Sequence, residues 1–177
     1  MKKDALLASV LAQFQVMYLL APQQSALLDQ ALRVYQDKAG PFKDVIFAAD
    51  VSEIATPVDL LGIGIALDAN GRWHEARIEG SALKVIESAK SVKPYRVYYF
   101  INLLTPDIDL PNDSISILFE YVKALITIPN TARERSVALA TGIQAEFDSE
   151  ETLMQRKDLI EQEMDECRGM LPMATVY

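Results

Sequence analysis

The chain has 177 residues, half of them apolar, and a formal net charge of −8. This length fits one domain, or one core with an appended arm, and the apolar content is enough for a sizeable core. The negative charge argues against a surface that binds duplex DNA, because neutralising phosphates needs clustered Lys and Arg.

Two helices are predicted at the start of the chain, over residues 4–20 and 25–39. Residues 1–21 resemble a secretory leader, but polar residues interrupt the apolar run, and its apolar residues fall at helical spacing. We therefore interpret this stretch as an amphipathic first helix that Pro22 ends. The second helix has Gly40 and Pro41 after it, a usual helix ending, and one apolar side made of Leu27, Leu28, Ala31, Leu32 and Tyr35.

Residues 42–104 are predicted to form a small antiparallel β unit. Residues 45–51 have strand composition, and residues 61–68 alternate apolar residues with small or polar ones. An Asn70-Gly71 turn then predicts a hairpin that returns over residues 73–78. Residues 81–91 are ambiguous, with a short helix favoured over a strand. A final strand is predicted over 95–104, bulky on both faces and therefore covered on both sides.

The hairpin contains two glycines, Gly62 and Gly64, on the face of the strand opposite its large apolar residues. Glycine in a strand often marks a place where another segment approaches closely. We expect these glycines to leave room for a neighbouring backbone, from this chain or from another.

The segment around which the rest is organised is a long apolar helix predicted over residues 113–128. A surface helix needs an apolar arc of roughly 100°, whereas this one has a single narrow polar stripe. It must therefore be covered from several directions. The cover is either the core of one copy or, in part, another subunit. The second interpretation predicts a subunit interface at Phe119, Val122, Leu125 and Ile126.

Two further helices are predicted after Pro129, over residues 131–147 and 150–168, and the run Asp148-Ser149-Glu150-Glu151 is the predicted cap of the second. The second is acidic and has a narrow apolar stripe. Residues 169–177 carry no charge, which predicts a docking tail, although a tail folded onto its own domain is the alternative. The docking residues are Met170, Leu171, Met173, Val176 and Tyr177. The fold class is thus α+β, with one domain over residues 1–168 and a tail over 169–177.

The residues that usually carry chemistry are few. His74 is the single histidine, which excludes a histidine-based metal cluster, and a structural role is expected for it. Cys167 is the single cysteine and lies on an apolar helical stripe, where packing is expected, so a reducing compartment fits best. The fragment Gly62-Ile63-Gly64 lacks the rest of a dinucleotide fingerprint. We therefore predict no catalytic residues, no metal, no cofactor and no enzyme activity.

The order of the elements resembles the head-to-tail connector adaptors of tailed bacteriophages, including the class called tail tubular protein A. The stretch that carries the resemblance is Tyr95-Arg96-Val97-Tyr98-Tyr99-Phe100, followed by Leu110-Pro111 and the helix through Glu120, Tyr121 and Leu125.

This resemblance implies a structural virion protein at the head-tail junction, assembled in the host cytoplasm. It would form a homo-oligomeric ring, usually of twelve subunits, between the portal protein and the next tail or neck protein. The ring would extend the channel for packaged DNA without sequence-specific binding, and no membrane is involved. The alternative is a bacterial cytoplasmic α+β binding or regulatory module without catalytic activity.

Overall fold

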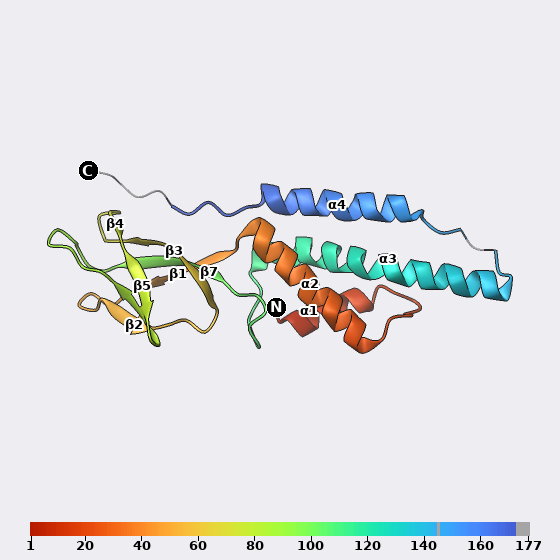
Figure 1. The fold of residues 1–177 in the computed structure, drawn as a ribbon, viewed down its shortest axis with the longest axis horizontal. Coiled ribbons are helices and arrows are strands. Elements are labelled where there is room, and N and C mark those ends of the chain that lie inside the picture. The colour runs from red at the N-terminus through yellow and green to blue at the C-terminus, as the bar shows by residue number, and fades with distance from the viewer. Residues whose placement is uncertain (145, 173–177) are drawn as a thin grey trace. The chain divides into compact units, whose positions relative to one another are not determined.

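The computed structural model describes residues 1–144 and 146–172 and has an α+β fold (Figure 1). The chain forms two compact units. The helical unit holds residues 1–39 and 106–168, and the β unit holds residues 40–105 together with the described tail residues 169–172. The stretch predicted as one domain, residues 1–168, thus contains both units, and along the chain the β unit is inserted between the second and third helices.

The helical unit is built around the long helix α3, Ile115–Thr141, which follows a short 3₁₀ turn, Asn112–Ser114. Three further helices pack with it: α1, Lys3–Leu11, α2, Ala21–Ala39, and α4, Glu150–Glu166 (Figure 1). The predicted apolar side of α2 is confirmed, because Leu28, Ala31, Leu32 and Tyr35 are all buried.

The first helix is shorter than predicted, because it ends at Leu11 and not near Leu20. The chain after it is held by Asn130 of α3. Its Oδ1 accepts a hydrogen bond from the Tyr18 amide at 2.8 Å, and its Nδ2 donates to the Val16 carbonyl at 3.2 Å. Pro22 lies in the first turn of α2, where a missing amide hydrogen costs little. These contacts depend on a residue more than a hundred positions away, so helical spacing alone could not reveal them.

Helix α3 continues through Pro129, so the predicted break there and the new helix starting at Thr131 are both wrong. A proline inside a helix removes one hydrogen bond and costs about 3 kcal/mol. Here buried residues flank it on the same helix, Ile126 before it and Asn130 after it, and their packing offsets that cost. The helix ends at Gly142, whose φ of +70° is the left-handed conformation that glycine adopts without strain.

Helix α4 begins at the predicted cap, where the Ser149 hydroxyl accepts a hydrogen bond from the Thr152 amide at 3.0 Å. Leu153 and Met164 are buried on its narrow apolar stripe. Cys167, predicted to pack on that stripe, is exposed, because the helix has already ended at Glu166.

A polar network fastens α4 to the rest of the helical unit. The Tyr121 hydroxyl of α3 donates to Glu161 at 2.6 Å, and the Lys157 amine donates to the same carboxylate oxygen at 2.8 Å. Lys38 of α2 pairs with Asp165 at 2.8 Å. Burial alone would raise the pKa of Glu161, but the hydrogen bonds from Lys157 and Tyr121 outweigh it and hold that pKa below its usual value.

The β unit contains two antiparallel sheets. The first has the strand order β1-β7-β3-β4, formed by Phe42–Ile46, Arg96–Ile101, Leu60–Leu67 and Trp73–His74. The second has the order β2-β6-β5, formed by Glu53–Ala55, Ala82–Val85 and Ala76–Glu79. Residues from both sheets form one core cluster, made of Phe47, Ala66, Leu83, Val85, Tyr95 and Val97.

The β unit corrects three local predictions. The first strand covers residues 42–46, not 45–51, and the region 81–91 supplies strand β6 instead of a short helix. In β6, Leu83 and Val85 are buried while Ala82 and Lys84 are half-buried, and the strand pairs with β2 and β5. The predicted turn is present, with Gly71 at a φ of +76°. The return over residues 73–78 is wrong in part, because only Trp73–His74 pairs with β3, whereas Ala76–Glu79 pairs with β6 in the second sheet.

Candidate interaction surfaces

The predicted subunit interface on α3 lies largely inside one copy. Val122 and Ile126 are fully buried and Leu125 is 6% exposed, in a helix packed with α1, α2 and α4 of the same chain. Phe119 is half-buried. Of the two interpretations of the cover of α3, the core of one copy accounts for the three buried residues, because three helices of the same chain pack with α3. Val122, Leu125 and Ile126 offer no surface to another subunit.

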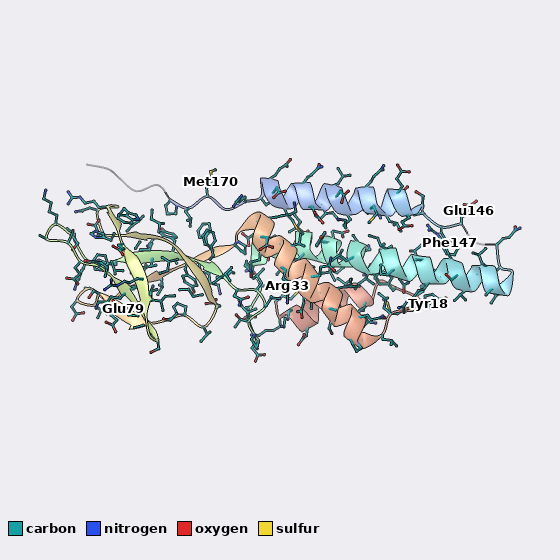
Figure 2. All side chains as sticks on the ribbon, in the orientation of Figure 1. Tyr18, Arg33, Glu79, Glu146, Phe147 and Met170 are labelled. Carbon is teal, nitrogen blue, oxygen red and sulfur yellow. The ribbon has the colours of Figure 1, made fainter. Side chains whose placement is uncertain are left out.

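The last turns of α3 carry the exposed apolar surface that was expected further back. Leu139 is 84% exposed and Ile143 is 64% exposed. They border a hollow of about 580 Å³ together with Phe147. Figure 2 labels Phe147 on the segment that leads to α4. The Arg135 guanidinium lies 6.0 Å from the centre of the Phe147 ring. We call Leu139, Ile143 and Phe147 the α3-end surface.

The α3-end surface was not among the predicted sites, although a signal for it exists in the sequence. Val137, Leu139 and Ile143 are large apolar residues beyond Pro129, in a stretch otherwise rich in Ala, Arg and Glu. The predicted break at Pro129 hid the fact that Val137 and Leu139 continue the central helix and that Ile143 follows its end. All three are more than 40% exposed.

The described part of the predicted docking tail lies on the β unit of its own chain. A Cβ placed on Gly64 would lie 2.8 Å from Cδ1 of Leu171 and 3.1 Å from the Tyr98 carbonyl oxygen. A Cβ placed on Gly169 would lie 2.6 Å from Cε1 of Phe42. A side chain at either glycine would therefore force Leu171 or Phe42 to move from its present position. We call Phe42 and Gly64 the tail site.

The glycines of this strand were predicted to make room for a neighbouring backbone, whereas at Gly64 the nearest neighbour is the Leu171 side chain, followed by the Tyr98 carbonyl oxygen. Gly62 is different, since a Cβ there would meet nothing within 4 Å. Met170, between the two contacting tail residues, is 90% exposed and points away from the chain (Figure 2). Met173, Val176 and Tyr177, the other predicted docking residues, lie outside the described residues.

The tail site belongs to the sheet face that is opposite the core. Phe42 and Tyr98 meet edge to face on it, with ring centres 6.1 Å apart. The same face continues past Tyr98 into a hollow of about 320 Å³, whose lining includes Ile46, Leu67, Pro94 and Arg96. The closing strand β7 thus presents half-buried Tyr98 and Phe100 on this face and buried Val97, Tyr99 and Ile101 on the other.

A buried carboxylate, Asp68, organises the loops at one end of the β unit. Its Oδ1 accepts from the amides of Asn70 and Arg72, at 2.8 and 2.9 Å, and its Oδ2 accepts from Val92 at 3.2 Å. Nε2 of His74, also buried, lies 3.4 Å from Oδ2 without the alignment of a hydrogen bond. Burial raises the pKa of Asp68, but the three amides outweigh burial and hold that pKa below its usual value. His74 is thus buried, its Nε2 has no hydrogen-bond partner among the described residues, and the surface or satisfied structural role expected for it stays a prediction.

A second carboxylate, Asp59, joins β1 and β7. Its carboxylate accepts hydrogen bonds from the Lys43 amine at 2.7 Å and from the Tyr99 hydroxyl at 3.1 Å. Burial, followed by the charge of Asp59, raises the pKa of Tyr99 to about 12. Each polar group of this cluster is already paired with another, so the arrangement holds the sheet together and leaves no group aimed at a ligand.

Within residues 1–144 and 146–172, no group of three or more His, Cys, Asp and Glu side chains is arranged to hold a metal ion. In the same residues no helix combines the length and apolar character that crossing a membrane requires. Neither a scan against protein-family models nor a search of curated proteins found a match for this chain.

Proposed function

We propose that the chain is a structural adaptor of the head-to-tail connector kind. It forms a ring between a phage portal protein and the tail, extends the DNA channel and offers a docking surface to the next tail or neck protein. The observation that carries this proposal is the α3-end surface, where Leu139 and Ile143 remain more than 60% exposed in one copy. A cluster of large exposed apolar residues beside a hollow is typical of a protein interface, and its occupant here is a second copy of the chain.

The order of the elements supports the same proposal. Two helices, an inserted β unit, a long helix and an acidic last helix follow each other as in the connector adaptors that the sequence resembles. A ring of such subunits, twelve in the usual connector, repeats one contact between two different surfaces of neighbouring copies. The ring closes when the rotation between neighbours is a whole fraction of 360°.

The charge of α4 suits a protein near a DNA channel. Lys157 pairs with Asp158 and Glu161, whereas the remaining acids are mostly exposed, namely Glu150, Glu151, Glu163 and Glu166. An acidic surface repels the phosphate backbone, so packaged DNA passes it without sequence-specific binding. This proposal places the protein at the head-tail junction of the virion.

The direct test is to mix the purified chain with the portal protein of the same phage and to measure the mass of the complex. The expected result is a portal complex enlarged by a ring of this chain, visible by electron microscopy as a collar on one side of the portal. A chain that leaves the portal mass unchanged would rule out the connector function. If its melting temperature rose instead with a small molecule, the binding-module alternative would replace it.

The α3-end surface makes a separate prediction. Replacing Leu139 by Glu puts a charge where the second copy is expected to pack, so we expect loss of the ring on the portal. The unfolding temperature of the isolated chain should stay within about 2 °C, because Leu139 touches solvent and exposed substitutions change stability by about 0.5 kcal/mol or less.

The matched control is Ala140→Glu, which adds the same charge to the neighbouring exposed residue of α3. Sedimentation of the portal mixture gives the readout for both variants. Equal ring formation by the two variants would show that the α3-end surface is not used in assembly.

A further inference from the structure

We propose that in the assembled protein the tail of each copy occupies the tail site of the next copy, so that subunits are joined by exchanged tails. The proposal deepens the connector function and rests on it for the ring. It is carried by the fit of Leu171 against Gly64 and of Gly169 against Phe42.

The chemistry of the site defines its ligand. Gly64 provides a strand position without a side chain, and a Cβ there would collide with the Leu171 side chain at 2.8 Å. Phe42 provides an aromatic surface on which only a residue without a side chain, such as Gly169, can lie as closely. The ligand is therefore an uncharged segment with glycine followed two residues later by a leucine, which is the sequence of this chain's own tail.

The connection to the tail is what allows an exchange. Met164 is the last buried residue of α4, and every residue from Asp165 to Met170 is exposed. This segment is held in the helical unit mainly by the pair between Lys38 and Asp165. Leu171 itself is only half-buried. Moving the tail to another copy therefore breaks few contacts in the helical unit. The contacts that it loses on its own β unit are formed again on the β unit of the second copy.

The direction of the exchange fits a ring. The tail leaves from α4 of the helical unit and binds the β unit, so donor and acceptor are different surfaces. Each copy then donates one tail and accepts one, which is a head-to-tail contact that generates closed rings. In an isolated copy its own tail fills the site, because a short connection gives that tail the higher effective concentration. Assembly on the portal brings neighbours close enough to compete.

The experiment uses two variants that each keep half of the contact. Leu171→Asp keeps an intact tail site but has a tail that cannot enter it. Gly64→Val keeps an intact tail but has a blocked site. Neither variant can bind its own tail, so a mixture of the two should form a 1:1 pair, and each alone should remain a monomer. Native mass spectrometry of the equimolar mixture gives the masses directly.

Three matched controls isolate the contact. Gly62→Val changes a glycine of the same strand where a Cβ meets nothing, and Met170→Asp changes the 90% exposed neighbour of Leu171. Because their own tails still bind, these two should not pair with either test variant. The third control combines Gly64→Val with Leu171→Asp and should not pair with Leu171→Asp. Circular dichroism of every variant confirms folding, and Gly64→Ala replaces Gly64→Val where the larger side chain unfolds the strand.

The outcomes separate this proposal from the connector function. Absence of the 1:1 pair between folded variants would overturn the tail exchange, and so would normal rings of Gly64→Val on the portal. If the 1:1 pair forms but the wild-type chain does not bind the portal, the tail exchange is supported and the connector function is ruled out. If Gly64→Val and Leu171→Asp each still form rings on the portal, the connector function is supported and the tail exchange is ruled out.

Discussion

Replacing Leu125 by Ala is expected to lower the free energy of unfolding of the helical unit by about 2 to 5 kcal/mol, the usual cost of removing a buried leucine side chain. Leu125 is 6% exposed in the middle of α3, between the fully buried Val122 and Ile126. Removing its side chain leaves a cavity in the core that α3 forms with the helices packed on it.

The matched control for this variant is Leu139→Ala on the same helix. Both changes remove the same atoms and replace them with the same helix former, but Leu139 is 84% exposed. We therefore expect its effect to stay within about 0.5 kcal/mol. Urea unfolding followed by circular dichroism compares the two. If Leu125→Ala left stability unchanged and instead weakened assembly, the middle of α3 would be a subunit interface after all.

The comparison of these two leucines shows what the sequence could predict about the assembly surface. The composition of residues 113–128 correctly indicated a helix covered from several sides, and α1, α2 and α4 provide that cover. The identity of the covering elements could not be read from the helix itself, because burial by the same chain and burial by another copy require the same apolar residues. The exposed apolar surface lies instead at Leu139 and Ile143.

The fold was predicted best where local signals were strong. The cap at Ser149, the turn at Gly71 and the ending at Gly40 all depend on a few adjacent residues. The errors arose where distant residues decide the structure. Asn130 holds the chain after α1, and pairing with β2 and β5 makes a strand of residues 82–85. Such contacts have no periodicity along the chain.

The position of the tail was predicted only in part. Its uncharged composition predicted burial, and the glycines of β3 predicted a close neighbour, yet nothing in the sequence connected the two. The structure brings Leu171 to Gly64 within the β unit. For the described residues this favours the alternative in which the tail folds onto its own chain, and it identifies the surface that an exchanged tail would use.

The second large effect is expected at Asp68 of the β unit. Asp68→Ala removes the acceptor of three partly buried amide hydrogens, those of Asn70, Arg72 and Val92. A hydrogen bond to a charged group contributes about 1.5 to 3 kcal/mol, so we expect a loss of about 3 kcal/mol or more. Trp73, the single tryptophan, lies in the adjacent strand β4, so its fluorescence reports the unfolding of this unit in urea. Asp44→Ala, which removes a solvent-exposed carboxylate from β1, should cost less than about 1 kcal/mol.

The same carboxylate gives a pH dependence whose sign follows from its lowered pKa. Three amide donors favour the charged form in the folded state, whereas the unfolded chain has an ordinary aspartate pKa of about 3.9. Stability from Asp68 is therefore complete above that unfolded value and is lost as the pH falls through the lower folded value. Asp68→Asn keeps the shape but cannot titrate, so its stability deficit relative to the wild type should shrink on going from pH 7 to below about pH 4. A deficit of constant size across this range would mean that the charge of Asp68 does not stabilise the turn, and that its shape alone orders the loops around His74.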